Sequence, residues 1–140
     1  MNFIQSISTC MRKYVTFSGR ATRSEFWWFY LFTVLVNLVA TSQASSFVPA
    51  LLDGQEMTEN ESSYFLNNFF FLYLSTITSL ILLLPSLAVA VRRLHDVGRS
   101  GWWILIAFTV IGIIPLLIWY VTDTKDEENV YGPNPKTEIA

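Results

Sequence analysis

The side chains that could do chemistry are concentrated in two short polar segments, residues 17–28 and 92–103. These segments hold five of the six arginines, two acids and the single histidine: Arg20, Arg23, Glu25, Arg92, Arg93, His95, Asp96 and Arg99. If Glu25 pairs with Arg92 or Arg93, and Asp96 with Arg20 or Arg23, three of the five guanidinium groups remain. A guanidinium fork binds phosphate through two parallel hydrogen bonds. The pattern therefore predicts either an ion-pair cluster or a site for an anionic lipid headgroup.

His95 stands beside Asp96, a combination that could suggest catalysis. Neighbouring residues on a helix point about 100° apart, so these two do not form the oriented pair that a triad needs. The sequence contains no glycine-rich phosphate loop, nucleophile elbow or H-E-x-x-H motif. We therefore predict a protein that is not an enzyme, with no catalytic residue and no cofactor. His95 is expected to serve as a cation at a helix end, a hydrogen-bond partner or a titrating switch.

Metal sites are equally unsupported by the sequence. One histidine and one cysteine, Cys10, do not provide the ligands of a usual zinc site. The acids at 123–128 lack the regular alternation of a calcium loop. We predict no metal, and a solvated acidic surface in this region.

The composition places these residues in a membrane protein. Of the 140 residues, 52% are hydrophobic and only 14% are charged, whereas a soluble domain carries about 25% charged residues. Three apolar stretches reach the roughly 20 residues that a helix needs to cross a bilayer: 26–47, 69–91 and 102–121. Backbone amides in lipid must be satisfied within the segment, so each should be helical. The predicted fold class is all-α integral membrane, with three transmembrane helices.

The third stretch has an alternative, because Gly112 and Pro115 interrupt it. Such residues are tolerated in membrane helices, and a spanning helix is the prediction. A re-entrant hairpin would instead return the tail to the side from which the segment entered.

The remaining chain is assigned by polarity. Residues 2–16 repeat apolar side chains at helical spacing and predict a short amphipathic interfacial helix on the inner leaflet, with a helix for a soluble partner as the alternative. Residues 48–68 are expected to form an acidic outer loop and 122–140 an exposed tail. The whole chain, 1–140, is expected to be a single membrane domain.

The basic residues predict the orientation of the spans. Seven of the nine precede the first span or lie between the second and third: Arg12, Lys13, Arg20, Arg23, Arg92, Arg93 and Arg99. By the positive-inside rule the N-terminus is cytoplasmic, and with three spans the C-terminal tail is periplasmic or extracellular. Four tryptophans should anchor the helices at headgroup depth: Trp27, Trp28, Trp102 and Trp103.

Local signals refine the helix ends and faces. Thr22 and Glu25 stand as T-x-x-E, which predicts a capping box and a helix beginning at Arg23. In the second span, Ser75, Ser79 and Ser86 are small residues that permit close helix association. The alternative for the hydroxyl groups of this span is a bond back to their own helix carbonyls.

The two polar segments and part of the tail resemble a known family. The run Phe17 to Trp28, the run from Arg92 to Trp103, and the tail segment Tyr131-Gly132-Pro133-Asn134-Pro135 resemble the small bacterial inner-membrane proteins grouped as domain of unknown function 805. The similarity covers nearly the whole chain. It implies a bacterial inner membrane and a compact bundle of about three helices, and it implies no reaction.

As function we expect a non-enzymatic structural or interaction module. It would self-associate as a homo-oligomer or dock on a larger membrane-protein partner, with its arginine cluster contacting anionic phospholipid of the bilayer and no nucleic acid partner. The alternative is an oligomeric conduit for ions or small solutes. The absence of Asp, Glu, Lys and Arg from the three predicted spans argues against the conduit, because transport pathways usually hold an ionisable residue at membrane depth.

Overall fold

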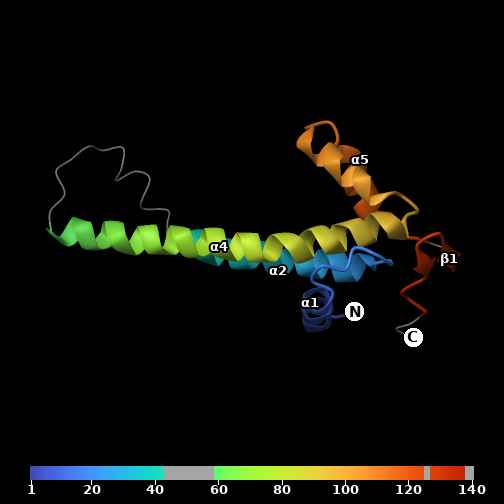
Figure 1. The fold of residues 1–140 in the computed structure, drawn as a ribbon, viewed down its shortest axis with the longest axis horizontal. Helices are drawn as coiled ribbons and strands as arrows, with labels where there is room; N and C mark the ends of the chain where they lie inside the picture. Colours follow the sequence, from blue (N-terminus) through green and yellow to red (C-terminus); the bar gives the residue numbers. More distant parts are fainter. Residues whose placement is uncertain (43–58, 125–126, 138–140) are drawn as a thin grey trace. The chain divides into compact units, whose positions relative to one another are not determined.

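The computed structural model describes residues 1–42, 59–124 and 127–137, and this part of the chain is mostly helical (Figure 1). Its elements are the helices α1 (Phe3–Arg12), α2 (Arg23–Ser42) and α4 (Glu59–Asp96), the 3-10 helix η1 (Gly101–Phe108), α5 (Ile113–Val121), and the strands β1 (Glu128–Asn129) and β2 (Gly132–Pro133). The chain divides into two compact units, Met1–Leu31 with Leu84–Ala140, and Phe32–Leu83.

Two helices in the described residues are long and apolar enough to cross a membrane, Arg23–Ser42 and Phe69–Asp96. They correspond to the first two predicted spans. The residues 43–47 assigned to the first span lie outside the described residues, as do positions 48–58 of the expected outer loop. The rest of that loop, residues 59–68, is helical and belongs to α4, which begins at Glu59. The chain has no Gly or Pro between Glu59 and Leu84 that would end the helix.

The third predicted span differs from the expectation. Residues 102–121 form no single helix; η1 and α5 are joined by a turn at 109–112. Gly112 donates its amide to Thr109, and a Cβ atom at Gly112 would lie 2.1 Å from the carbonyl oxygen of Ile106. Only glycine, which has no Cβ atom, allows the backbone at position 112 to lie this close to Ile106. Pro115 follows in the first turn of α5, where its missing amide hydrogen costs nothing.

In the unit Phe32–Leu83, a hydrogen bond connects the two helices. The Ser79 hydroxyl donates to Oδ1 of Asn37 at 2.6 Å, and the Asn37 amide group donates to the carbonyl of Thr33 at 2.8 Å. The other hydroxyl groups of this stretch bond back to their own helix, with Ser75 donating to Leu72 at 2.8 Å. Ser79 therefore bonds the neighbouring helix, whereas Ser75 bonds its own helix. Ser86 lies farther along α4, in the other unit.

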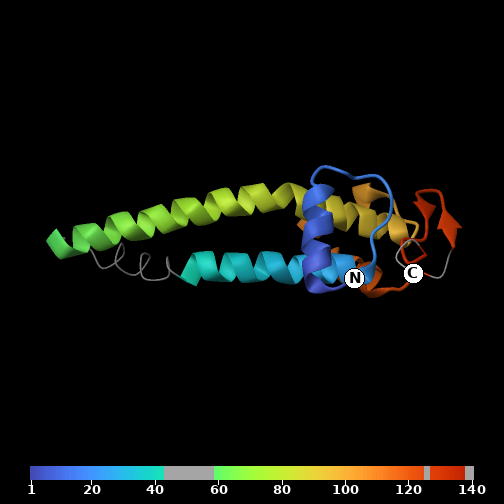
Figure 2. The same cartoon turned by 90° about the horizontal axis from the view of Figure 1, so that it is seen from below.

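The other unit is built on the start of α2 and the end of α4. Its core includes Phe29, Val89 and Leu94, each no more than 2% exposed. Helix α1 runs across the start of α2 and the end of α4 (Figure 2) and is shorter than the predicted 2–16. It begins at a capping box, in which the Gln5 amide donates to the side chain of Asn2 at 2.9 Å and the Gln5 side chain accepts from the Asn2 amide.

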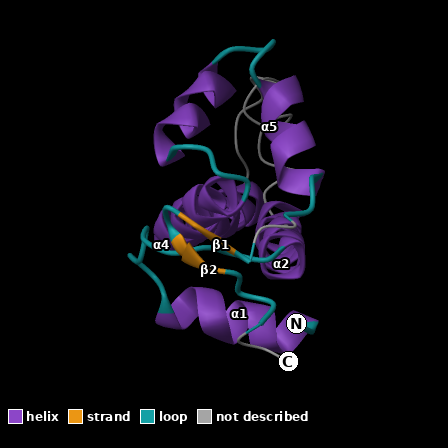
Figure 3. Ribbon diagram, turned by 90° about the vertical axis from the view of Figure 1, so that its right-hand side faces the viewer, coloured by secondary structure: helices purple, strands orange, loops and turns teal. Residues whose placement is uncertain are grey.

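The tail lies in this same unit. Strands β1 and β2 form a small antiparallel hairpin in which Asn129 is opposite Gly132 (Figure 3). Arg20 of the first polar segment donates to the carbonyl of Gly132 at 3.2 Å, and Arg23 donates to Asp123 at 3.1 Å. The tail and the first polar segment therefore lie in contact, whereas the sequence led us to expect them on opposite sides of a membrane. The reason is the division of residues 102–121, which brings the chain back to the end where it started.

Candidate arginine cluster

Two buried ion-pair groups hold the two polar segments together. Arg92 donates to Glu25 at 2.6 Å, and Arg20 donates to Asp96 at 2.8 Å. Arg93 also pairs with Asp96. All five residues are at most 5% exposed. Both Glu25 and Asp96 take one of the partners that the sequence suggested for them.

The start of α2 positions Glu25. The Thr22 hydroxyl accepts from the Glu25 amide at 3.1 Å, as the capping motif predicts. The Glu25 carboxylate accepts instead from Arg92 and, at 3.8 Å, from the Cys10 thiol of α1. The cap therefore fixes the backbone of α2, while the carboxylate ties α2 to α4 and α1.

Arg93 ties the end of α4 to the end of α5. Its guanidinium donates to the carbonyls of Tyr120 at 3.2 Å, of Thr122, and of Ala21 at 3.4 Å. Carbonyls at a helix C-terminus lack an intrahelical donor, and a basic side chain satisfies them. This residue therefore holds the exit of the η1 and α5 hairpin against the first polar segment.

The tail hairpin is held by the end of α4. The Asn129 side chain donates to the carbonyl of His95 at 3.0 Å, and the Thr124 hydroxyl donates to the carbonyl of Asp96 at 2.6 Å. The His95 ring stacks on Tyr131 with centroids 3.9 Å apart. His95 Nδ1 lies 3.2 Å from the carbonyl of Gly19, and because a carbonyl only accepts, Nδ1 carries hydrogen. His95 is thus a hydrogen-bond partner and a stacking surface.

Arg92 is incompletely satisfied. Its Nε and Nη2 atoms are buried and have no hydrogen-bond partner in the described part of the chain. A buried donor left unpaired costs about 1–3 kcal/mol. The guanidinium is therefore kept in place by its bond to Glu25, and loss of that bond would leave the whole group without compensation.

Cys10 is a neighbour of this pair that the sequence did not single out. Its side chain is fully buried. Burial, reinforced by the Glu25 charge, raises the pKa of the thiol to about 12. The thiol therefore stays protonated at neutral pH and acts as a small packing group with a weak donor.

The remaining site residues lie at the surface. Arg23 bonds Asp123 and the carbonyl of Val121, and Arg99 stacks over Trp119 with 5.2 Å to the ring centroid. A hydrogen bond from Lys136, with the charges of Lys136 and Arg23, holds the pKa of Asp123 below its usual value. The four predicted anchors, Trp27, Trp28, Trp102 and Trp103, are all exposed, by 36–79%.

No group of three potential metal-ligating side chains occurs among the residues that the structure describes. Thr124, Asn129 and Asn37 also take part in the contacts above, and sequence reasoning missed them. A lone Thr or Asn outside a cap or turn motif carries no spacing signal. Of the tail, the sequence indicated only residues 131–135 as a segment of interest, through the family resemblance.

These features define a small helical protein in which two polar segments and a tail hairpin meet at a buried arginine cluster. The chain belongs to the family described as protein of unknown function, DUF805, whose model matches residues 14–133. This confirms the resemblance drawn from the motifs.

Two relatives from Escherichia coli (strain K12) are similar along nearly their whole length. The inner membrane protein YhaI is 37% identical over 127 residues, covering 90% of this chain and 91% of the relative. The inner membrane protein YhaH is 36% identical over 132 residues, covering 91% and 93%. No solved structure matches the chain.

We predict that replacing Arg92 by Gln destabilises the protein by about 3–5 kcal/mol, because it leaves the Glu25 carboxylate buried without its cation. Thermal unfolding of the purified protein in detergent measures the effect. The matched control is Arg99→Gln, which removes the same charge from an exposed stack worth about 0.5–1 kcal/mol. Equal losses for the two variants would contradict a structural role for the buried pair.

Proposed function

We propose that this chain is a non-enzymatic module of the bacterial inner membrane. It self-associates or docks on a larger membrane partner, and its arginine-rich end contacts anionic lipid. The observation that carries the proposal is the pairing of its buried charges. Glu25, Asp96 and their arginine partners bond one another or backbone carbonyls, which favours a structural joint over a reacting site.

The location follows from the relatives and the apolar helices. YhaI and YhaH are named inner membrane proteins, and α2 and α4 provide two candidate spans. The exposed side chains of these helices are largely apolar, among them Leu38, Val39 and Leu80. Such faces suit lipid tails or the helices of a partner.

We propose that the arginine cluster faces the cytoplasm, since the seven bases of α1 and the two polar segments lie at this end of the two candidate spans, together with Lys136 of the tail. The tail contacts the same cluster, so it is cytoplasmic as well. The η1 and α5 hairpin then enters and leaves the inner leaflet from one side. Its tip supports this, because Phe108, Val110 and Ile111 are more than 80% exposed.

The lipid contact is assigned to the exposed bases of this end rather than to the buried ones. Arg99 is exposed and has its guanidinium over a tryptophan ring, a position from which it reaches headgroups. Arg92 and Arg93 were natural candidates from the sequence, but both side chains are buried. Arg92 donates to Glu25 through Nη1, and Arg93 donates to Asp96 and to the carbonyl of Tyr120.

We predict that both termini lie on the cytoplasmic side. A fluorescent protein fused to either end should fluoresce, and alkaline phosphatase fused to either end should be inactive. A phosphatase inserted after Ser42 is the positive control for the opposite side. An active phosphatase at the C-terminus would contradict the hairpin topology and restore the three-span arrangement.

We predict that the protein extracted gently from its own membranes retains anionic phospholipid together with a second copy or a partner protein, as recorded by native mass spectrometry. Arg99→Gln should lower the retained anionic lipid about fivefold, because each basic residue near the membrane surface contributes about 1 kcal/mol to the binding of anionic lipid. Lys136→Gln is the matched control, because Asp123 already neutralises Lys136 at 2.6 Å. A lone protein without lipid would contradict the proposal.

A further inference from the structure

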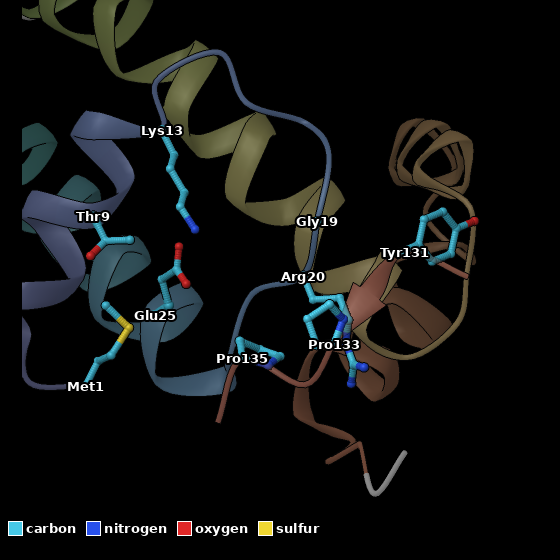
Figure 4. Close-up of a pocket in the computed structure, with 9 residues that line it drawn as sticks. All are labelled: Met1, Thr9, Lys13, Gly19, Arg20, Glu25, Tyr131, Pro133 and Pro135. Carbon is cyan, nitrogen blue, oxygen red and sulfur yellow. The ribbon is translucent and has the colours of Figure 1, made fainter. Parts of the chain in front are cut away.

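Two cavities of different character adjoin the arginine cluster, and Tyr131 lines both. The first has a volume of about 330 Å³ and lies between the end of α1, the loop before α2, the start of α2 and the tail (Figure 4). Its lining combines the charged side chains Lys13, Arg20 and Glu25 with apolar ones such as Met1 and Pro133. The second has a volume of about 490 Å³ and lies against η1 and the end of α4. Both volumes fall in the range of small-molecule sites, about 300–1,000 Å³.

The first cavity presents opposite charges to its contents. The amine of Lys13 and the carboxylate of Glu25 point toward one another (Figure 4), and these two described side chains form no ion pair with each other. Glu25 is 3% exposed and is oriented by its bonds to Arg92 and Cys10. The cavity thus offers a fixed acceptor on one side and a flexible cationic donor on the other.

The second cavity is mainly apolar. Its walls include Val91, Trp102, Ile104 and Leu105, with the ring of His95 at the side shared with Tyr131. The bond between His95 Nδ1 and the carbonyl of Gly19 connects the linings of the two cavities, because Gly19 belongs to the first one. Tyr131 therefore lines both the cavity that holds the charged side chains and the apolar one.

We propose that the two cavities bind one phospholipid whose headgroup carries a phosphate and a primary amine. The amine donates to the Glu25 carboxylate, the phosphate accepts from Lys13, and an acyl chain occupies the apolar cavity beside Trp102 and Leu105. The assignment rests on the proposed inner-membrane location. It differs from the surface contact of Arg99 with anionic lipid, because a carboxylate lines this cavity and a headgroup of purely negative charge would meet it.

The test offers the full-length protein an equal mixture of three phospholipids with identical acyl chains, bearing ethanolamine, choline or glycerol headgroups. Native mass spectrometry records the retained lipid. Ethanolamine should be retained over choline, which has no N–H to donate to Glu25, and over glycerol, which has no amine. Equal retention of ethanolamine and choline lipids would overturn the proposal.

Two variants on α1 locate the site. Lys13→Gln should lower ethanolamine-lipid retention about tenfold, the loss expected for a hydrogen bond to a charged group. Arg12→Gln removes the same charge one residue away, where the guanidinium bonds only Ser8 among the described residues, and should leave retention unchanged. Both side chains are exposed, so folding is retained. Identical behaviour of the two variants would overturn the assignment.

A soluble competitor separates the two possible sources of this headgroup chemistry. Glycerophosphoethanolamine, which has no acyl chains, should compete poorly if the apolar cavity contributes to binding. Competition as strong as that of the lipid would overturn the phospholipid assignment in favour of a soluble ligand. Loss of ethanolamine preference with intact Arg99-dependent retention of anionic lipid would overturn this inference alone and leave the proposed function standing.

Discussion

The burial of charge between two segments far apart in the sequence is the constraint on which the unit around the arginine cluster depends. Glu25 and Asp96 are desolvated, and each is compensated by an arginine from the opposite segment, at 2.6 Å and 2.8 Å. Removing a buried charge from its partner costs several kcal/mol, although forming the pair gains little over apolar packing. The pairs therefore act mainly on specificity: they fix which helix ends meet, and the hairpin and the tail then attach to the same arginines.

Much of this arrangement could be predicted from the sequence. Glu25 and Asp96 stand at the same ends of two antiparallel spans, so their pairing with arginines of the opposite segment follows from topology. The division of residues 102–121 into two shorter helices could not be predicted, because the segment is as long and as apolar as a membrane span. Gly112 was visible as an interruption, but only the contact with Ile106 makes the turn necessary. The place of the tail depended on that turn, and Asn129 and Thr124 carry no signal of their own.

The cluster also explains how a protein with few charged residues keeps a defined arrangement where the two polar segments meet. Helices α2 and α4 expose apolar side chains that lipid satisfies without specificity, so their packing alone leaves many arrangements of similar free energy. Directional bonds from Arg92, Arg93 and Arg20 select one of them. The cavities beside Tyr131 share residues with the cluster, since Arg20, Glu25 and His95 belong both to the cluster and to the cavity walls. The proposed lipid site thus uses residues that also hold the cluster together.

The central claim is that Glu25 and Arg92 act as a coupled buried pair, and a double-mutant cycle measures this most directly. Glu25→Leu, Arg92→Leu and the double variant are compared with the parent by thermal unfolding in one detergent. The account predicts two strongly destabilised single variants and a double variant that recovers much of the loss, with a coupling free energy of at least about 1 kcal/mol. Additive effects of the two substitutions, or single variants as stable as the parent, would contradict it.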